Sequence, residues 1–96
     1  MRKRETQPIK GVIREYIEAL GHQRKFKEVN IVSSWSKLMG SVIAKRTKNI
    51  YIKNKVLYVY LDSAVMRNEL MMMREQIRTH INEHAGAPIV EKIMFK

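Results

Sequence analysis

The 96-residue sequence carries 19 Lys and Arg against 9 Asp and Glu, a formal net charge of +10, and it has no cysteine. A chain of this length is expected to form one small domain, and the lack of cysteine excludes disulfides, thiolate metal sites and a cysteine nucleophile. No apolar run is long enough for a signal peptide or a membrane span, so we expect a cytoplasmic protein that does not associate with membranes.

The positive charge is concentrated in the first part of the chain. Residues 1–55 hold 14 Lys and Arg against 4 Asp and Glu, whereas residues 56–96 hold five of each and are neutral overall. Such one-sided basicity favours a polyanionic partner, above all nucleic acid. The alternative is a basic surface that only keeps a small protein soluble.

The chain begins with charged residues that show no periodicity. Residues 1–6 are therefore predicted to form a flexible basic arm, followed by a single domain over residues 7–96. Pro8 is suited to the first turn of a helix, and the apolar residues after it recur at helical spacing. These are Ile9, Val12, Ile13, Tyr16, Ile17 and Leu20. Gly21 is predicted to end this helix as its C-terminal cap.

A second helical region is predicted from about residue 26 to residue 45, after a basic connection over residues 22–27. Trp35 lies on the apolar line of this region, which predicts a buried anchor in the core rather than a stacking surface. Gly40 interrupts the pattern and is unfavourable inside a helix, so we expect a kink or a break there.

Residues 47–63 carry the clearest pattern in the chain, two arms of strict period two joined at Asn54-Lys55. This pattern predicts a β-hairpin with a two-residue turn. One face of the hairpin is apolar and can form the floor of a core: Ile50, Ile52, Leu57, Val59 and Leu61. The other face carries rings and charge: Tyr51, Tyr58 and Tyr60, with Lys53 and Lys55 near the turn.

A long helix is predicted after the hairpin, from about residue 64 to residue 84, with Asp62 or Ser63 as its N-terminal cap. Gly86 stops this helix, and residues 89–95 are predicted to form a last strand that returns to the same sheet by a crossover. The order α-α-β-β-α-β indicates an α+β fold, a three-stranded sheet with helices packed on one face.

No catalytic constellation is visible, so the chain is predicted not to be an enzyme and to need no cofactor or small-molecule substrate. His80 and His84 share a helix face, but two imidazoles without a third ligand make a poor metal site, and no metal is expected. The run Met71–Met73 is interpreted as filler for a small core rather than as a partner groove.

The candidate nucleic-acid-binding residues are basic side chains around the hairpin, a basic stretch before it, and the outward tyrosines. We expect the cations to contact phosphates and the rings to stack on bases. The cations are Lys45, Arg46, Lys48, Lys53 and Lys55, extended by Arg24, Lys25 and Lys27, and the rings are Tyr51, Tyr58 and Tyr60. The alternative for the tyrosines is cross-strand packing that only shields the sheet.

An ordered set of short signals spans the chain from Gln7 to Phe95: Trp35, Met39-Gly40, Ile43-Ala44, Thr47, Asn54-Lys55-Val56-Leu57-Tyr58-Val59, Arg67-Asn68-Glu69-Leu70 and Ile81-Asn82. This set resembles the DciA-like domain family, long catalogued as a bacterial domain of unknown function, and the Gln7-Pro8-Ile9 opening resembles its Bacteroidetes branch. The resemblance implies a fold similar to a KH domain. It also implies a helicase operator or loader that assists the replicative helicase onto single-stranded DNA without an ATPase of its own.

Two departures from that resemblance affect its implications. The sequence ends at the last predicted strand, so the extended tail of longer family members is not expected here. It also has no Gly-x-x-Gly loop, so the backbone clamp of KH domains is not carried over.

The sequence as a whole predicts a non-enzymatic nucleic-acid-binding adapter of DNA replication initiation. Its expected partners are DNA, single-stranded or forked, and the replicative helicase. Two alternatives stay open: a KH-like RNA-binding or ribosome-assembly factor, and a protein-interaction module that uses the Met-rich helix and offers its basic face to an acidic partner.

Overall fold

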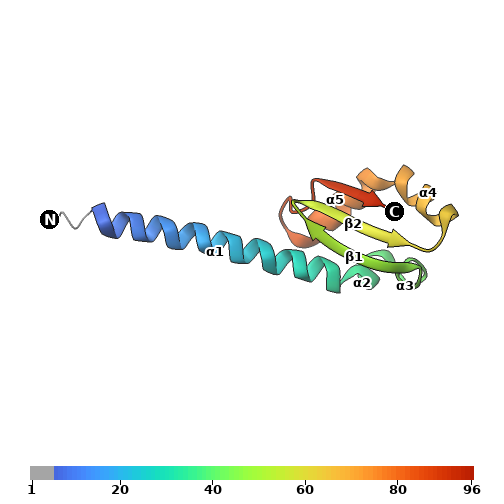
Figure 1. The fold of residues 1–96 in the computed structure, drawn as a ribbon, viewed down its shortest axis with the longest axis horizontal. Helices are drawn as coiled ribbons and strands as arrows, with labels where there is room; N and C mark the ends of the chain where they lie inside the picture. The colour runs from blue at the N-terminus through green and yellow to red at the C-terminus, as the bar shows by residue number, and fades with distance from the viewer. Residues whose placement is uncertain (1–5) are drawn as a thin grey trace.

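The computed structural model describes the backbone of residues 6–96 and the side chains of residues 11–16 and 18–96. The elements are α1 (Thr6–Ser33), α2 (Trp35–Met39), α3 (Ser41–Lys45), β1 (Thr47–Lys53), β2 (Val56–Leu61), α4 (Ala64–Met72), α5 (Arg74–Ala85) and β3 (Lys92–Phe95), as Figure 1 shows. The predicted basic arm lies outside the described residues, apart from Thr6, where α1 begins. The predicted α+β fold is confirmed.

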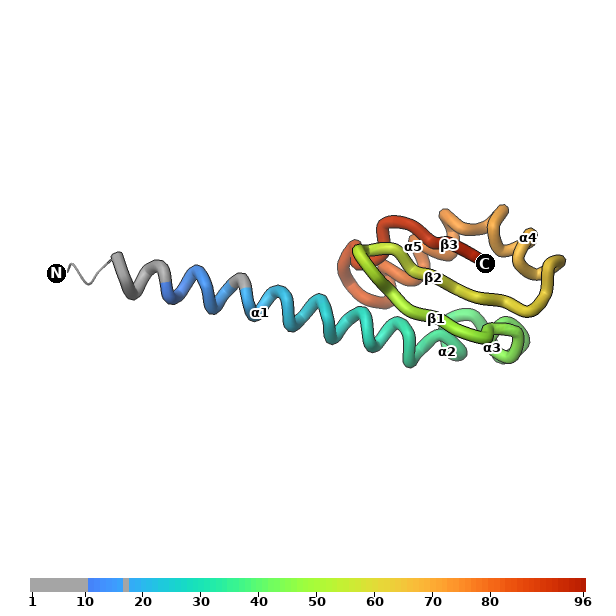
Figure 2. Tube along the Cα trace, viewed as in Figure 1, coloured from blue at the N-terminus to red at the C-terminus, as the bar shows by residue number. Residues whose placement is uncertain are grey.

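The three strands form one sheet in the order β1-β2-β3. β1 and β2 are antiparallel and are joined by the predicted two-residue turn, in which Asn54 and Lys55 have φ values of 52° and 67°. Positive φ at both positions is the requirement of a tight hairpin turn that matches the twist of its strands. β3 runs parallel to β2 after the crossover through α4 and α5 (Figure 2). The hairpin and the crossover are confirmed.

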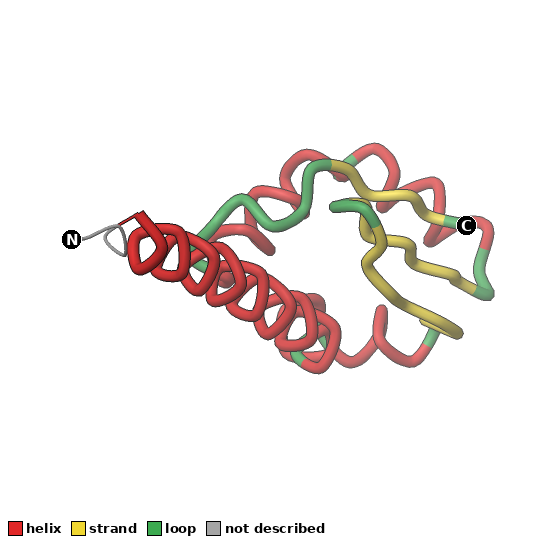
Figure 3. The backbone as a smooth tube through the Cα atoms, turned by 60° about the vertical axis from the view of Figure 1, so that its left-hand side comes forward, coloured by secondary structure: helices red, strands yellow, loops and turns green. Residues whose placement is uncertain are grey.

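The core lies between the sheet and the helices that cover one of its faces, an arrangement visible in Figure 3. The sheet contributes Leu57, Val59, Leu61, Ile93 and Phe95, and the helices contribute Ile31, Trp35, Leu70, Ile77 and Ile81. The indole Nε1 of Trp35 donates to Thr47 Oγ1 at 3.0 Å, and that hydroxyl donates to the Ile43 carbonyl at 2.8 Å. The predicted burial of Trp35 is confirmed, since only 4% of the residue is exposed.

The prediction that the first helix ends at Gly21 is wrong, because α1 runs without a break from Thr6 to Ser33. Gly21 does not have the positive φ of a C-terminal cap, and one glycine costs a helix interior only about 1 kcal/mol. The predicted basic connection over residues 22–27 is therefore helical. The N-terminal half of α1 projects away from the sheet (Figure 1), and the molecule measures 66 × 20 × 19 Å.

The break predicted near Gly40 is confirmed. Gly40 has a φ of 92° and a ψ of 161°, and it separates α2 from α3. The single helix predicted for residues 64–84 is wrong, since Met73 (φ −104°, ψ 12°) divides it into α4 and α5. Nothing in the sequence around Met73 explains this break. Ser63 is confirmed as a cap, because its Oγ accepts a hydrogen bond from the Met66 N–H at 3.2 Å.

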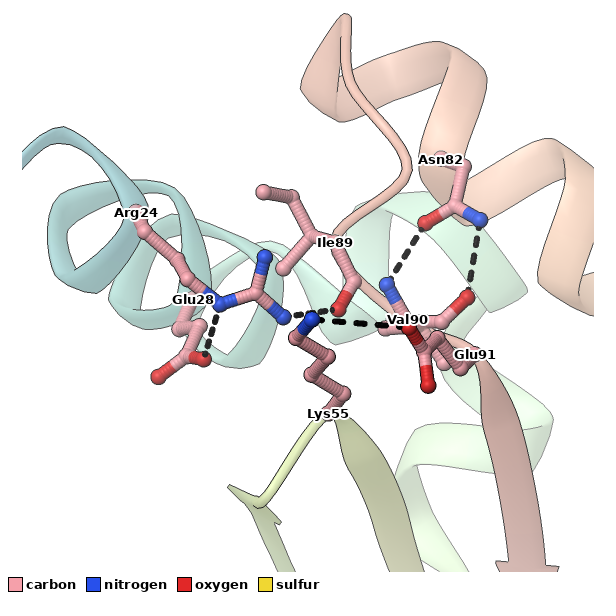
Figure 4. Close-up of polar contacts among 7 residues, drawn as sticks. All are labelled: Arg24, Glu28, Lys55, Asn82, Ile89, Val90 and Glu91. Atoms are coloured by element: carbon pink, nitrogen blue, oxygen red, sulfur yellow. Dashed lines mark hydrogen bonds and ion pairs between the residues drawn. The ribbon is translucent and has the colours of Figure 1, made fainter. Parts of the chain in front are cut away.

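The last strand is shorter than predicted and covers Lys92–Phe95 only. Asn82 on α5 accounts for the difference. Its side-chain amide donates to the Val90 carbonyl and its Oδ1 accepts from the Val90 N–H, both at 2.9 Å (Figure 4). The backbone around Val90 is therefore tied to the end of α5 rather than to the ladder of β2.

Candidate nucleic-acid interface

The face of the sheet opposite the helices carries the three predicted tyrosines. Tyr51 lies directly across from Tyr58, with ring centroids 5.0 Å apart, and diagonally from Tyr60, at 6.1 Å. Both ring pairs are stacked, with interplanar angles of 23° and 24°. We call these three side chains the tyrosine row. They pack on each other as cross-strand and diagonal pairs do, and Tyr51 is still 37% exposed.

The hydroxyl groups of Tyr51 and Tyr60 lie 3.4 Å apart and can share a hydrogen bond. This hydrogen bond raises the pKa of Tyr51 above its ordinary value, and partial burial and the neighbouring phenols raise it further. The raised pKa favours the neutral phenol of Tyr51, which places no negative charge where a phosphate backbone could approach.

β3 also contributes residues to this open face, and the sequence did not identify them as candidates. In the parallel register Lys92 lies beside Val56, and Met94 lies beside Tyr58. Val56 is also the cross-strand partner of Lys53, so Lys53 and Lys92 flank it from the two outer strands. Both lysines are exposed, and among the described side chains neither lies in an ion pair.

Lys92 was not among the predicted cations, because the second half of the chain is neutral overall. The period-two alternation of the last strand, combined with a parallel register, is the signal that could have placed Lys92 on the open face. The same alternation places Lys96, the final residue, on the open face. Its backbone N–H donates to the Val59 carbonyl at 2.8 Å, so the residue lies alongside β2.

At the base of the hairpin two predicted cations share one carboxylate. Arg46 Nη1 lies 3.8 Å from Asp62, and Lys48 Nζ lies 3.4 Å from the other oxygen of the same side chain. The group thus keeps one net positive charge. Lys45 is exposed at the end of α3, and Lys55 at the turn pairs with Glu91 at 3.6 Å. Exposed ion pairs of this kind contribute about 0–1 kcal/mol, so a phosphate could replace the carboxylate at little cost.

Two of the predicted cations on α1 make contacts inside the fold. Arg24 Nη2 donates to the Ile89 carbonyl at 2.6 Å while its Nε lies 3.4 Å from Glu28, as Figure 4 shows. Lys27 Nζ donates to the Ala85 carbonyl at 2.9 Å, at the C-terminal end of α5, where a cation also interacts well with the helix dipole. Lys27 thus links α1 to the end of α5, and Arg24 links α1 to the loop that follows α5. Their predicted contact with nucleic acid, like that of the exposed Lys25, stays a prediction.

Two exposed apolar surfaces lie outside the open face. Met71, Met72 and Met73 are 41%, 82% and 47% exposed at the break between α4 and α5, so the interpretation of these residues as core filler is wrong. On α1 the predicted apolar stripe is exposed at Val12, Ile13, Tyr16 and Leu20. Neither surface contributes to the core formed by the described residues.

Within the described residues no three His, Cys, Asp or Glu side chains come together as a metal site would require. Every helix in the same part of the chain is too short or too polar to cross a lipid bilayer. The open face brings the tyrosine row together with exposed lysines, and we take it as the candidate interface.

Comparison with known sequences gives two matches. Residues 8–95 match the sequence profile of the family described as Dna[CI] antecedent, DciA. The chain is also similar to a UPF0232 protein of Corynebacterium glutamicum (strain R), with 29% identity over 90 residues. That alignment covers 94% of this chain and 51% of the relative, so the chain spans about half the length of the relative.

Proposed function

The chain belongs to the DciA family, and on that premise we propose that it is a non-enzymatic adapter that binds single-stranded DNA and assists loading of the replicative helicase. The observation that supports this most strongly is the open sheet face. There the tyrosine row lies next to the exposed cations Lys53 and Lys92, with no helix above it.

The chemistry of this face suits a single strand better than a duplex. Bases of a single strand are free to stack on aromatic rings, and each such contact contributes about 1–3 kcal/mol. In a duplex the flat faces of the bases are already stacked on one another, so they are not free to stack on the tyrosines, and only base edges and phosphates remain for contact. Tyrosines beside lysines therefore match a strand whose bases lie on the sheet and whose phosphates lie along its rim.

The mutual packing of the tyrosines is compatible with this role. Tyr51 stacks on both Tyr58 and Tyr60, and this mutual packing restricts the rotamers of the rings before any ligand arrives. A preorganised surface loses less conformational entropy when a ligand binds than flexible side chains would. Shielding the sheet and binding bases are thus two roles that the same row can combine.

The experiment that tests the proposal is competition binding with a labelled single-stranded DNA of about 20 nucleotides, a length that exceeds one site of this kind. Unlabelled single-stranded DNA should compete best, and duplex DNA should be weaker. Tyr58→Ala should weaken binding by about 1–3 kcal/mol in the fraction that remains folded. Preference for RNA would favour the alternative of an RNA-binding factor, and no binding to any nucleic acid would refute the proposal.

The helicase part of the proposal needs a separate experiment. Affinity purification of the tagged chain from its own cells, with nuclease treatment throughout, should retain the replicative helicase. Retention of ribosomal proteins instead would favour a role in ribosome assembly. Loss of the helicase on nuclease treatment would show that nucleic acid, and not the adapter, links the two.

A further inference from the structure

A hollow of about 310 Å³ lies between the second half of α1 and strand β1. From α1 it is lined by Lys25, Glu28, Val29, Val32 and Ser33, and from β1 by Ile50, Tyr51 and Ile52. Its size is at the lower end of the range of ligand-binding pockets, about 300–1,000 Å³. Four of its eight lining side chains are aliphatic, and Val29 is 56% exposed.

The hollow follows the open edge of the sheet. Side chains of successive strand residues point to opposite faces, so a space that touches three consecutive residues of β1 must run along the edge of the strand. β1 is an outer strand, since β2 is its only neighbour in the sheet of the described residues. The space between α1 and β1 is therefore bounded on one side by strand backbone.

The register shows which backbone groups face this space. The two-residue turn is closed by Lys53 and Val56, which form a hydrogen-bonded pair, and pairs alternate along an antiparallel ladder. Ile52 and Ile50 are then the residues whose N–H and C=O groups point away from β2. The Ile50 N–H donates to Asn49 Oδ1 at 2.9 Å, which agrees with this orientation. Among the described residues, the Ile52 N–H and the Ile50 and Ile52 carbonyls have no hydrogen-bond partner outside the ladder.

We propose that this edge slot binds an extended apolar peptide segment of a partner protein, which adds a fourth strand beside β1. An added strand satisfies the outward groups of Ile50 and Ile52, and its alternate side chains enter the hollow against Val29. The slot runs along the edge of the sheet and shares only Tyr51 with the tyrosine row, so it adds a protein contact beside the proposed nucleic-acid contact.

Charge at the slot defines the peptide further. Glu28 already lies 3.4 Å from Arg24, whereas Lys25 is exposed beside the hollow and is in no ion pair among the described side chains. The slot therefore presents one uncompensated cation. The segment that fits carries an acidic residue next to its apolar positions.

The test uses a synthetic acetylated peptide in which alternating valine and threonine are flanked by glutamates. Titration into the full chain, followed by amide hydrogen exchange in NMR spectra, should slow exchange of the Ile52 N–H by about tenfold or more when the strand is added. A peptide with lysines in place of the glutamates should bind about twofold to fivefold more weakly, as expected for the loss of one exposed charge contact.

A variant pair separates the slot from a general effect on folding. Val29→Arg fills the hollow from an exposed position and should abolish peptide binding without lowering the melting temperature. Val65→Arg is the matched control, because Val65 is an exposed valine on α4, 71% accessible, and does not line the slot. This variant should bind like the parent chain.

Three results would overturn the inference: no binding of the glutamate peptide at millimolar concentration, equal binding by the Val29→Arg variant, or protection of the Ile52 N–H by single-stranded DNA that also displaces the peptide. The last result would assign the slot to nucleic acid. Failure of the peptide to bind would leave the DNA affinity of the open face unchanged, so this proposal and the proposed function can fail separately.

Discussion

Replacement of Asn82 by alanine should destabilise the fold more than any other exchange of a polar side chain among the described residues. Asn82 exchanges two hydrogen bonds of 2.9 Å with the backbone of Val90, which is fully buried (Figure 4). Asn82→Ala leaves one buried donor and one buried acceptor unpaired, at about 1–3 kcal/mol each. Since Asn82 itself is only partly buried, water can reach the site in part, and we expect a total of about 2–4 kcal/mol.

Chemical and thermal denaturation of the full chain measure this effect. For a domain of this size, about 1 kcal/mol corresponds to 4–8 °C, so the melting temperature should fall by about 8–30 °C. Asn82→Asp keeps the acceptor but sets a carboxylate oxygen against the Val90 carbonyl, so it should lower the melting temperature as well. Asn68→Ala on the exposed side of α4 is the matched control and should change little. A shift for Asn82→Ala no larger than that of the control would refute the role given to this contact.

Three further predictions concern the core, the glycines and the tyrosine row. Trp35→Ala should lower the free energy of unfolding by about 3–5 kcal/mol, and Trp35→Phe, which loses mainly the hydrogen bond to Thr47, should cost clearly less in urea titrations. Gly21→Ala should raise helix content and stabilise α1 by up to about 1 kcal/mol. Gly40→Ala should destabilise the fold by about 1–3 kcal/mol, because Gly40 has a φ of 92°. Circular dichroism during thermal unfolding measures both, and stability changes of the same sign would contradict the backbone assignment. Tyr60→Phe should lower the pKa of Tyr51 towards its ordinary value in an absorbance titration, because the hydroxyl contact that raises it is removed. Since that pKa is raised in the folded state, the stabilisation by this contact is complete below the ordinary tyrosine pKa and is lost as pH rises through the folded value.

The sequence was most informative where the period of the apolar pattern matched a short element. The hairpin at residues 47–63, the cap at Ser63 and the break at Gly40 follow from local chemistry: alternation, a hydroxyl before a helix, and a residue that permits positive φ. These features depend on neighbours in sequence. They could therefore be predicted without knowledge of the tertiary structure.

The features that the sequence did not reveal depend on tertiary contacts. Gly21 resembles a helix stop in sequence, yet α1 continues past it. Beyond that glycine, Arg24 and Lys27 donate hydrogen bonds to the carbonyls of Ile89 and Ala85, contacts that no local pattern reveals. The last strand is shortened by Asn82, a residue eight positions from Val90. The contribution of Lys92 to the open face depends on the parallel register with β2, which no local pattern determines. The exposed methionines at the break between α4 and α5 likewise follow from a helix break with no local signal.

The salt dependence of single-stranded DNA affinity tests the central claim most directly. If about four cations neutralise phosphates, log affinity should fall against log salt concentration with a slope near −3, from about −0.7 for each contact on a single strand. Lys53→Ala with Lys92→Ala should flatten the slope by about 1.4, whereas Lys37→Ala with Arg78→Ala, which removes the same charge from helices, should leave it nearly unchanged. Equal slopes for the two double variants would contradict a nucleic-acid interface on the open face of the sheet.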